Sequence, residues 1–245
     1  MAINKNGVLS GQVGPLVYRN VDGDQIVQTK PKQNPKQTAA TKEASIDFGI
    51  ISKTARLIRS GLIETHQKLY DSKMVNRLNE QVSRALRANP DQTTGLMSMD
   101  LAKLKRLVDF QFNADYHMHD VLYLDPEIKL SDKAILSIDL PGFDILRAVK
   151  MPENCRKIAL NFNLMAIDFK MQKHTAVGNI VLEAEAYINH SKVDPQSWQV
   201  NCSPYQNQTL FVGLHIDYLA YHGKYLQILN SKTCHPASIV AAFHI

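Results

Sequence analysis

The sequence predicts an α+β protein: an N-terminal extended arm with a β-hairpin, then a helical hairpin, then an antiparallel β-sandwich of immunoglobulin-like or jelly-roll-like type. Three observations predict this order. Glycines and prolines interrupt the first residues, apolar residues then recur every three or four positions, and later every second position. We therefore expect an arm with a basic linker at 1–37, a helical region at 38–107 and a β-sandwich at 108–245.

The arm begins with residues that oppose a helix, because three glycines and a proline are spaced through Gly7–Pro15. Two β-prone runs follow, Leu16–Arg19 and Gln25–Thr29, and Asp22-Gly23 lies between them. An Asp-Gly pair between such runs is a strong hairpin signal. An isolated hairpin is only marginally stable in water, so we expect this one to dock on another surface.

A basic linker follows the hairpin, because Lys30–Gln37 combine two prolines and three lysines without a large apolar residue. If the docking surface is a neighbouring copy, the hairpin supplies apolar contacts and the lysines lie near acidic residues of that copy. The residues expected at this assembly interface are Leu16, Val17, Tyr18, Ile26, Val27, Lys30, Lys32 and Lys36.

Two helices are predicted after the linker. The first has an apolar stripe and a capping residue at Thr38 or Thr41, and the second stops before Asn89-Pro90. The first stripe consists of Phe48, Ile51, Ala55, Ile58 and Leu62, and the second of Met74, Val75, Leu78, Val82, Ala85 and Leu86. A further short helix is indicated by Met97, Leu101, Leu104 and Val108. Lys53, Arg56 and Arg59 lie off the first stripe, on a basic face.

Beyond this region the apolar residues alternate, which is typical of half-buried strands. The expected strands are 134–140, 158–164, 179–187, 209–218 and 226–229. In the third, Ile180, Leu182, Ala184, Ala186 and Ile188 share one face, and Val181, Glu183, Glu185 and Tyr187 share the other. Strands separated by turns without helices favour an antiparallel sandwich of roughly seven or more strands.

Charge is distributed unevenly along the chain. The residues through Arg106 carry 17 Lys and Arg against 9 Asp and Glu, a net of +8, and the remainder carries a net of −3. A basic half beside an acidic half suits nucleic-acid binding, and it also suits head-to-tail association of identical subunits.

The chain has no apolar run near the roughly 20 residues that span a bilayer, and Met1–Lys5 lack the apolar core of a signal peptide. We therefore expect no membrane span and synthesis in the cytoplasm without a signal peptide. For an assembly subunit, the final site could be a virion or an extracellular particle. Cys155, Cys202 and Cys234 are few and far apart, which favours buried thiols in a reducing compartment.

The opening of the chain contains Gly11–Arg19, Gln25-Ile-Val27, Pro35-Lys-Gln-Thr38 and an expected helix with Phe48. In these segments it resembles a large Bacteroidota family for which no activity is established. Members begin with a glycine-spaced segment, a short hairpin, a turn and a helix, followed by a β-rich region. The resemblance is clearest over roughly the first 60 residues, and its motif implies structure rather than a catalytic site. The chain departs from the family pattern at Thr38-Ala-Ala-Thr41, where members usually have Thr-Pro-Ala and then Gln.

A search for catalytic chemistry gives one weak metal candidate, His117 and His119 with Asp120, which lacks a third ligand of matched spacing. The sequence has no Gly-x-Ser-x-Gly elbow and no phosphate-binding Gly-rich loop. Cys234 and His235 are adjacent, which is poor geometry for a nucleophile and its base. We therefore expect no enzyme, no cofactor and no catalytic or metal site.

The architecture predicts a structural subunit of a phage-like, tail-like or filamentous bacterial assembly, whose partners are other copies of itself and further assembly components. One alternative is a monomeric or dimeric binding module for a protein or glycan. Another is non-specific nucleic-acid binding, which would be electrostatic because no aromatic stacking motif accompanies the basic residues.

Overall fold

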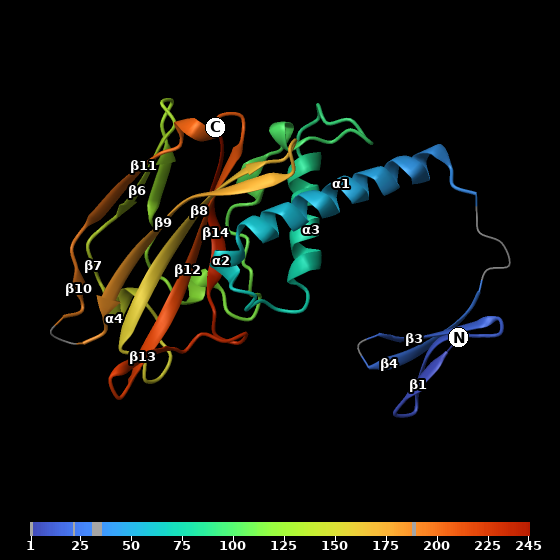
Figure 1. Cartoon of the computed structure of the whole chain (residues 1–245), viewed down its shortest axis with the longest axis horizontal. Coiled ribbons are helices and arrows are strands. Elements are labelled where there is room, and N and C mark those ends of the chain that lie inside the picture. The colour runs from blue at the N-terminus through green and yellow to red at the C-terminus, as the bar shows by residue number, and fades with distance from the viewer. Residues whose placement is uncertain (1, 22, 31–35, 188–189) are drawn as a thin grey trace. The chain divides into compact units, whose positions relative to one another are not determined.

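The computed structural model describes residues 2–21, 23–30, 36–187 and 190–245. The chain divides into two compact units, Met1–Lys42 and Glu43–Ile245. The expected α+β class is confirmed, with antiparallel sheets and a strand-rich C-terminal region (Figure 1). The division differs from the expected 37/38 and 107/108 boundaries, because it falls inside the first helix and leaves the other helices with the strands.

The first unit contains a four-stranded antiparallel sheet in the order β1-β2-β3-β4. Its strands are β1 (Ile3–Lys5), β2 (Val8–Val13), β3 (Leu16–Val21) and β4 (Asp24–Thr29). The expected hairpin is β3–β4, in which Tyr18 faces Val27. β1 and β2 are additional, and Asn6 and Gly7 both take a positive φ, 51° and 82°, in the turn that joins them. An Asn-Gly pair is favoured there because this type of hairpin turn requires two positive φ angles.

The two predicted apolar stripes lie on α1 (Ala39–Gly61) and α3 (Met74–Arg87), while α2 (Ile63–His66) and α4 (Ile145–Ala148) were not predicted. The structure also has 3-10 turns at Met99–Leu101, Leu104–Arg106, Met118–Asp120 and Ser203–Tyr205. Thr38 caps α1, since its hydroxyl accepts from the backbone N–H of Thr41. The placement of Phe48 on the buried stripe was wrong: its side chain is 65% exposed, because this part of α1 extends past most of the core.

All five expected strands are present, and others join them. The expected strands are β6 (Ile135–Leu140), β8 (Lys157–Asp168), β9 (Lys173–Glu185), β12 (Thr209–His222) and β13 (Tyr225–Ile228). The additional strands of this region are β5 (Glu127–Leu130), β7 (Phe143–Asp144), β10 (Lys192–Val193), β11 (Gln196–Asn201) and β14 (Ala237–His244). β13, β12, β8, β9 and β14 form a five-stranded sheet, and β11, β6 and β5 form a three-stranded sheet.

The five-stranded sheet is the middle of three layers (Figure 1). One face packs on the three-stranded sheet, where Phe162 and Leu214 join Ile138 in one apolar core. The other face packs on the helices, where Met165 and Phe211 join a second core. The expected sandwich is therefore present, but its large sheet is also covered by helices, so the strand region shares a core with α1–α3.

The edges of the five-stranded sheet differ in how they are covered. Residues 109–112 run along β14, where Asp109 N–H donates to the Ile239 carbonyl at 2.7 Å and Phe112 N–H to the Ala237 carbonyl at 2.8 Å. β9 lies at the opposite edge, and no described strand pairs with its outer side. On β9, Ile180, Leu182 and Ala184 pack on the core, as their alternation predicted, while Ile188 lies outside the described residues.

Candidate functional site

The N-terminal sheet lacks a buried core. None of the described residues between 2 and 42 is buried, although β2, β3 and β4 carry several apolar side chains. Val13 and Val27 are each 49% exposed. A sheet without a buried face gains little from apolar burial, so the paired strands need another surface for their stability.

The register of β3 and β4 divides the predicted interface between two faces. Residues directly opposite each other share a face, so Leu16, Tyr18 and Val27 lie together with Val13, which pairs with Leu16. We call this set of four residues the Tyr18 face. Val17, Val21 and Ile26 lie on the other side, the Ile26 face.

Of the three predicted lysines, Lys30 and Lys36 are exposed, and Lys32 lies outside the described residues. Lys30 N–H donates to the Pro15 carbonyl at 2.7 Å, which ties the end of β4 to the β2–β3 turn. The first unit carries six Lys and Arg against two Asp, a net of +4. Its charge therefore favours an acidic contact surface.

A buried polar network lies on the helix-facing side of the five-stranded sheet. His215 Nδ1 lies 3.1 Å from Asn163 Nδ2, and His215 Nε2 lies 3.0 Å from Gln67 Nε2 and 3.4 Å from Asp217 Oδ2. Asn161 Nδ2 donates to Asp217 Oδ2 at 3.1 Å. These five residues are among those that line a cavity of about 490 Å³.

The network stabilises the charged form of Asp217. Burial alone would raise the pKa of this carboxyl, but the hydrogen bond and charge of His215, with smaller contributions from His235 and Gln67, hold it below its usual value. The described polar contacts of His215 are amides and this carboxylate, and its ring lies 5.6 Å from the His235 ring between centroids. Among the described residues, no hydroxyl or thiol therefore contacts the His215–Asp217 pair. We therefore assign the network to joining α2 and the sheet.

His235 connects the same elements in its neutral form. Its Nε2 lies 3.0 Å from the Thr65 carbonyl, and its Nδ1 lies 2.8 Å from Asn230 Nδ2. The Asn230 amide is fixed, because its Oδ1 accepts from Tyr218 N–H and its Nδ2 also donates to the Ile216 carbonyl. Nδ1 must therefore accept and Nε2 must donate, which is the neutral tautomer.

Acidification should destabilise the fold through His235. Burial lowers the pKa of His235 from 6.5 to about 4. Between these values the unfolded chain binds the proton and the folded chain does not, so the free energy of unfolding falls as pH falls. We expect a loss of about 2 kcal/mol from this group between pH 7 and pH 5, measured by urea unfolding.

Two variants separate this contribution from other titrations. His235→Gln should be less stable at pH 7 but should lose less stability on acidification. His222→Gln, at an exposed position, is the control for replacing a histidine with glutamine. An unchanged pH dependence in His235→Gln would contradict the assignment.

The metal candidate of the sequence does not have the expected strand geometry. His117 precedes the 3-10 turn that contains His119, both are exposed, and His119 Nε2 lies 3.7 Å from Asp109 Oδ1. Among the described residues no group of three or more His, Cys, Asp or Glu is placed to hold a metal ion. Within the same residues, no helix is both long and apolar enough to cross a membrane.

The cysteines are free thiols in the structure. Cys155 and Cys202 are buried and Cys234 is partly buried. Burial raises the pKa of Cys155 and of Cys202, which makes them less reactive than exposed thiols.

No protein-family model matches this chain, and no curated protein does. Functional inference therefore depends on the geometry described above. Sequence reasoning predicted the β3–β4 hairpin. It missed the His215 network, because the members of this network are distant in sequence and most of them alternate with apolar residues in β8 and β12.

Proposed function

We propose that the chain is a structural subunit that associates with further copies of itself through its N-terminal sheet, in a phage-like, tail-like or filamentous bacterial assembly. A virion or an extracellular particle is the proposed final site. Membership of the Bacteroidota family that the first residues resemble is part of the same proposal. The observation that carries it is a paired sheet in which no described residue is buried.

The physical support is the exposed apolar surface of the N-terminal sheet, because burying it against another copy would stabilise the association. Burying a Val, Leu or Ile side chain contributes about 1.5–3 kcal/mol, so covering the four residues of the Tyr18 face would contribute several kcal/mol. A second copy of the chain supplies an identical surface. Contacts of this kind close into a ring or continue as a filament, depending on the rotation between copies.

The second unit offers a complementary edge for strand addition. β9 is 13 residues long, and its outer side has no described partner strand. Exposed edges of this length invite pairing with another chain. The strands of the N-terminal sheet are six residues or shorter, so one of them fits along part of β9.

Removal of residues 1–37 tests the proposal. The truncated chain begins at Thr38 and so keeps the α1 cap, and it loses no described residue that is buried. Full-length protein should form concentration-dependent higher-order species in sedimentation velocity, and the truncated protein should remain one small species. Higher salt should weaken full-length association only partly, because salt screens charges but not apolar burial.

The control is the folded state of the truncated chain, measured by its cooperative thermal unfolding. A full-length protein that stays monomeric at high concentration would contradict self-association and would favour the binding-module alternative. Equal association of both chains would place the contact outside the N-terminal sheet.

A further inference from the structure

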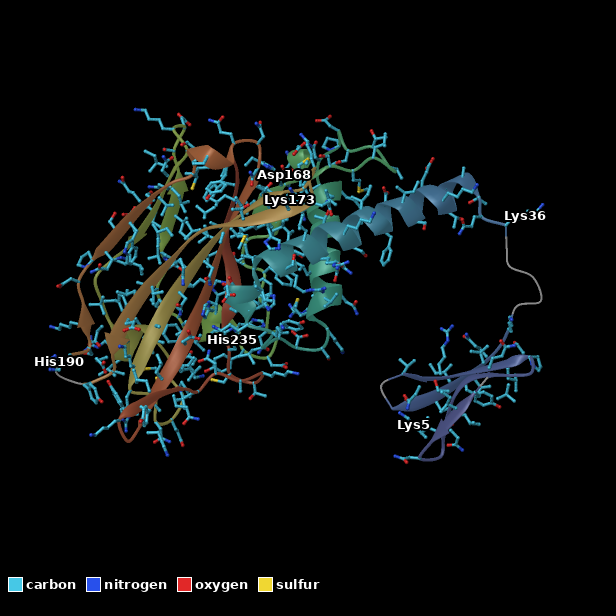
Figure 2. All side chains as sticks on the ribbon, in the orientation of Figure 1. Lys5, Lys36, Asp168, Lys173, His190 and His235 are labelled. Atoms are coloured by element: carbon cyan, nitrogen blue, oxygen red, sulfur yellow. The ribbon has the colours of Figure 1, made fainter. Side chains whose placement is uncertain are left out.

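A cleft of about 870 Å³ lies between α1 and the β8–β9 hairpin. Lys53, Arg56, Leu57 and Ser60 of α1 form one wall, and residues 172–175 form the other. Lys53 and Arg56 are three positions apart, which places them on the same side of a helix. Figure 2 labels Asp168, where β8 ends, and Lys173, where β9 begins, on either side of the hairpin turn.

The two walls are held together by close packing at Gly61, the last residue of α1. A Cβ atom at Gly61 would lie 3.4 Å from the Cβ of His174 and 3.0 Å from the Cγ of Met165. The absence of a side chain therefore allows the helix end to lie directly against β9 and the sheet. The position of the basic side chains of α1 relative to β9 follows from this contact.

The cleft is lined by cations and hydroxyls. Lys53, Arg56, Lys173 and His174 contribute basic groups, and no lining residue is acidic. Thr175 contributes a hydroxyl, while the Ser60 hydroxyl donates to the Leu57 carbonyl at 2.9 Å. Among the described residues, the ion pairs involve neither Lys53, Arg56 nor Lys173. Three permanent charges of one sign around one hollow repel each other, and a bound anion would remove that repulsion.

The acidic residue opposite Lys173 in the strand register is Asp168. Its Oδ1 accepts from the backbone N–H groups of Lys170 at 3.0 Å and Met171 at 2.8 Å, so it stabilises the hairpin turn. Lys170 pairs with Asp100 at 2.8 Å instead. Neither of these two carboxylates forms an ion pair with a cation that lines the cleft.

We propose that this cleft binds the phosphates of a phosphate-rich ligand. Guanidinium and ammonium groups with hydroxyl donors are the side chains that phosphate oxygens prefer. Residues 172–175 and the four α1 residues include no aromatic ring other than the His174 imidazole. Binding therefore follows phosphate charge and not base identity, and the phosphates come from a nucleic-acid strand or from a free oligophosphate.

The test measures the affinity of the full chain for two probes at about 50 mM salt, where electrostatic binding is strong. The probes are a labelled oligothymidylate and sodium tripolyphosphate. Lys53→Gln/Arg56→Gln should weaken binding at least tenfold. For the oligothymidylate, loss of two phosphate contacts should reduce the slope of log affinity against log salt by about 1.4.

The matched control is Lys105→Gln/Arg147→Gln, which removes the same charge from two exposed positions outside the cleft. It should bind like the wild type, and both variants should retain the wild-type unfolding temperature. Cleft-dependent binding of the oligothymidylate identifies a nucleic-acid strand as the source, and cleft-dependent binding of tripolyphosphate alone identifies a free oligophosphate. Binding of neither probe, or equal weakening in both variants, would overturn the proposal.

Discussion

Gly213→Ala is expected to lower the free energy of unfolding by about 3 kcal/mol, at the upper end of the usual cost of overpacking. Gly213 lies in β12, where α2 crosses the sheet. A Cβ atom there would lie 2.2 Å from Thr65 Oγ1 and 2.8 Å from Thr65 Cγ2. Thr65 is fully buried and β-branched, so its side chain cannot rotate away without a new clash. Urea unfolding of the full chain measures the loss.

Two further variants identify the cause. Thr65→Ala removes both clashing atoms, so it should restore much of the stability of Gly213→Ala, with a coupling energy of about 2 kcal/mol in a double-mutant cycle. Gly178→Ala is the matched control, because Gly178 also lies in the sheet but a Cβ atom there would have no neighbouring atom within 4 Å. A loss in Gly178→Ala as large as that in Gly213→Ala would contradict the packing explanation.

The fold was predictable where one periodicity dominates a segment. The second stripe predicted a helix that stops before Asn89-Pro90, and α3 ends at Arg87. The alternation in β9 predicted which residues reach the core. The prediction that Phe48 is buried was wrong, because an apolar stripe in the sequence does not show how much of the helix is covered by its packing partners. The Asn6-Gly7 turn carried a usable signal, and recognising it would have predicted β1 and β2.

The sites depend on distances that a linear pattern does not contain. β8 is buried on both faces, so Asn161 and Asn163 face the helices while their neighbours face the other sheet, and alternation alone cannot distinguish such polar residues from exposed ones. The basic face with Lys53 and Arg56 was predicted from the sequence. Lys173 and His174 lie opposite this face only because β9 returns beside α1. Long-range pairing therefore created both sites.

Val27→Lys is expected to weaken self-association at least about 100-fold, which corresponds to about 3 kcal/mol. This prediction depends on the proposed function and chooses between the two faces of the N-terminal sheet. The Tyr18 face presents four apolar residues in adjacent register positions. On the Ile26 face, Arg19 lies opposite Ile26 and Asp24 lies opposite Val21, so burial of that face would also bury charges. The Tyr18 face is therefore expected to lie against the neighbouring copy.

Ile26→Lys is the matched control for Val27→Lys. The two residues are adjacent in β4, both are β-branched, and their exposed fractions are 45% and 49%. Each substitution adds one positive charge and replaces a β-branched residue with Lys, so the changes in net charge and in strand propensity are nearly equal. The two variants differ in the face of the sheet that carries the new lysine. Sedimentation velocity across a concentration series should show association for Ile26→Lys and its loss for Val27→Lys. The reverse order would place the Ile26 face in the contact, and equal weakening would indicate that copies join through strand edges, since edge pairing brings both faces into the neighbouring sheet.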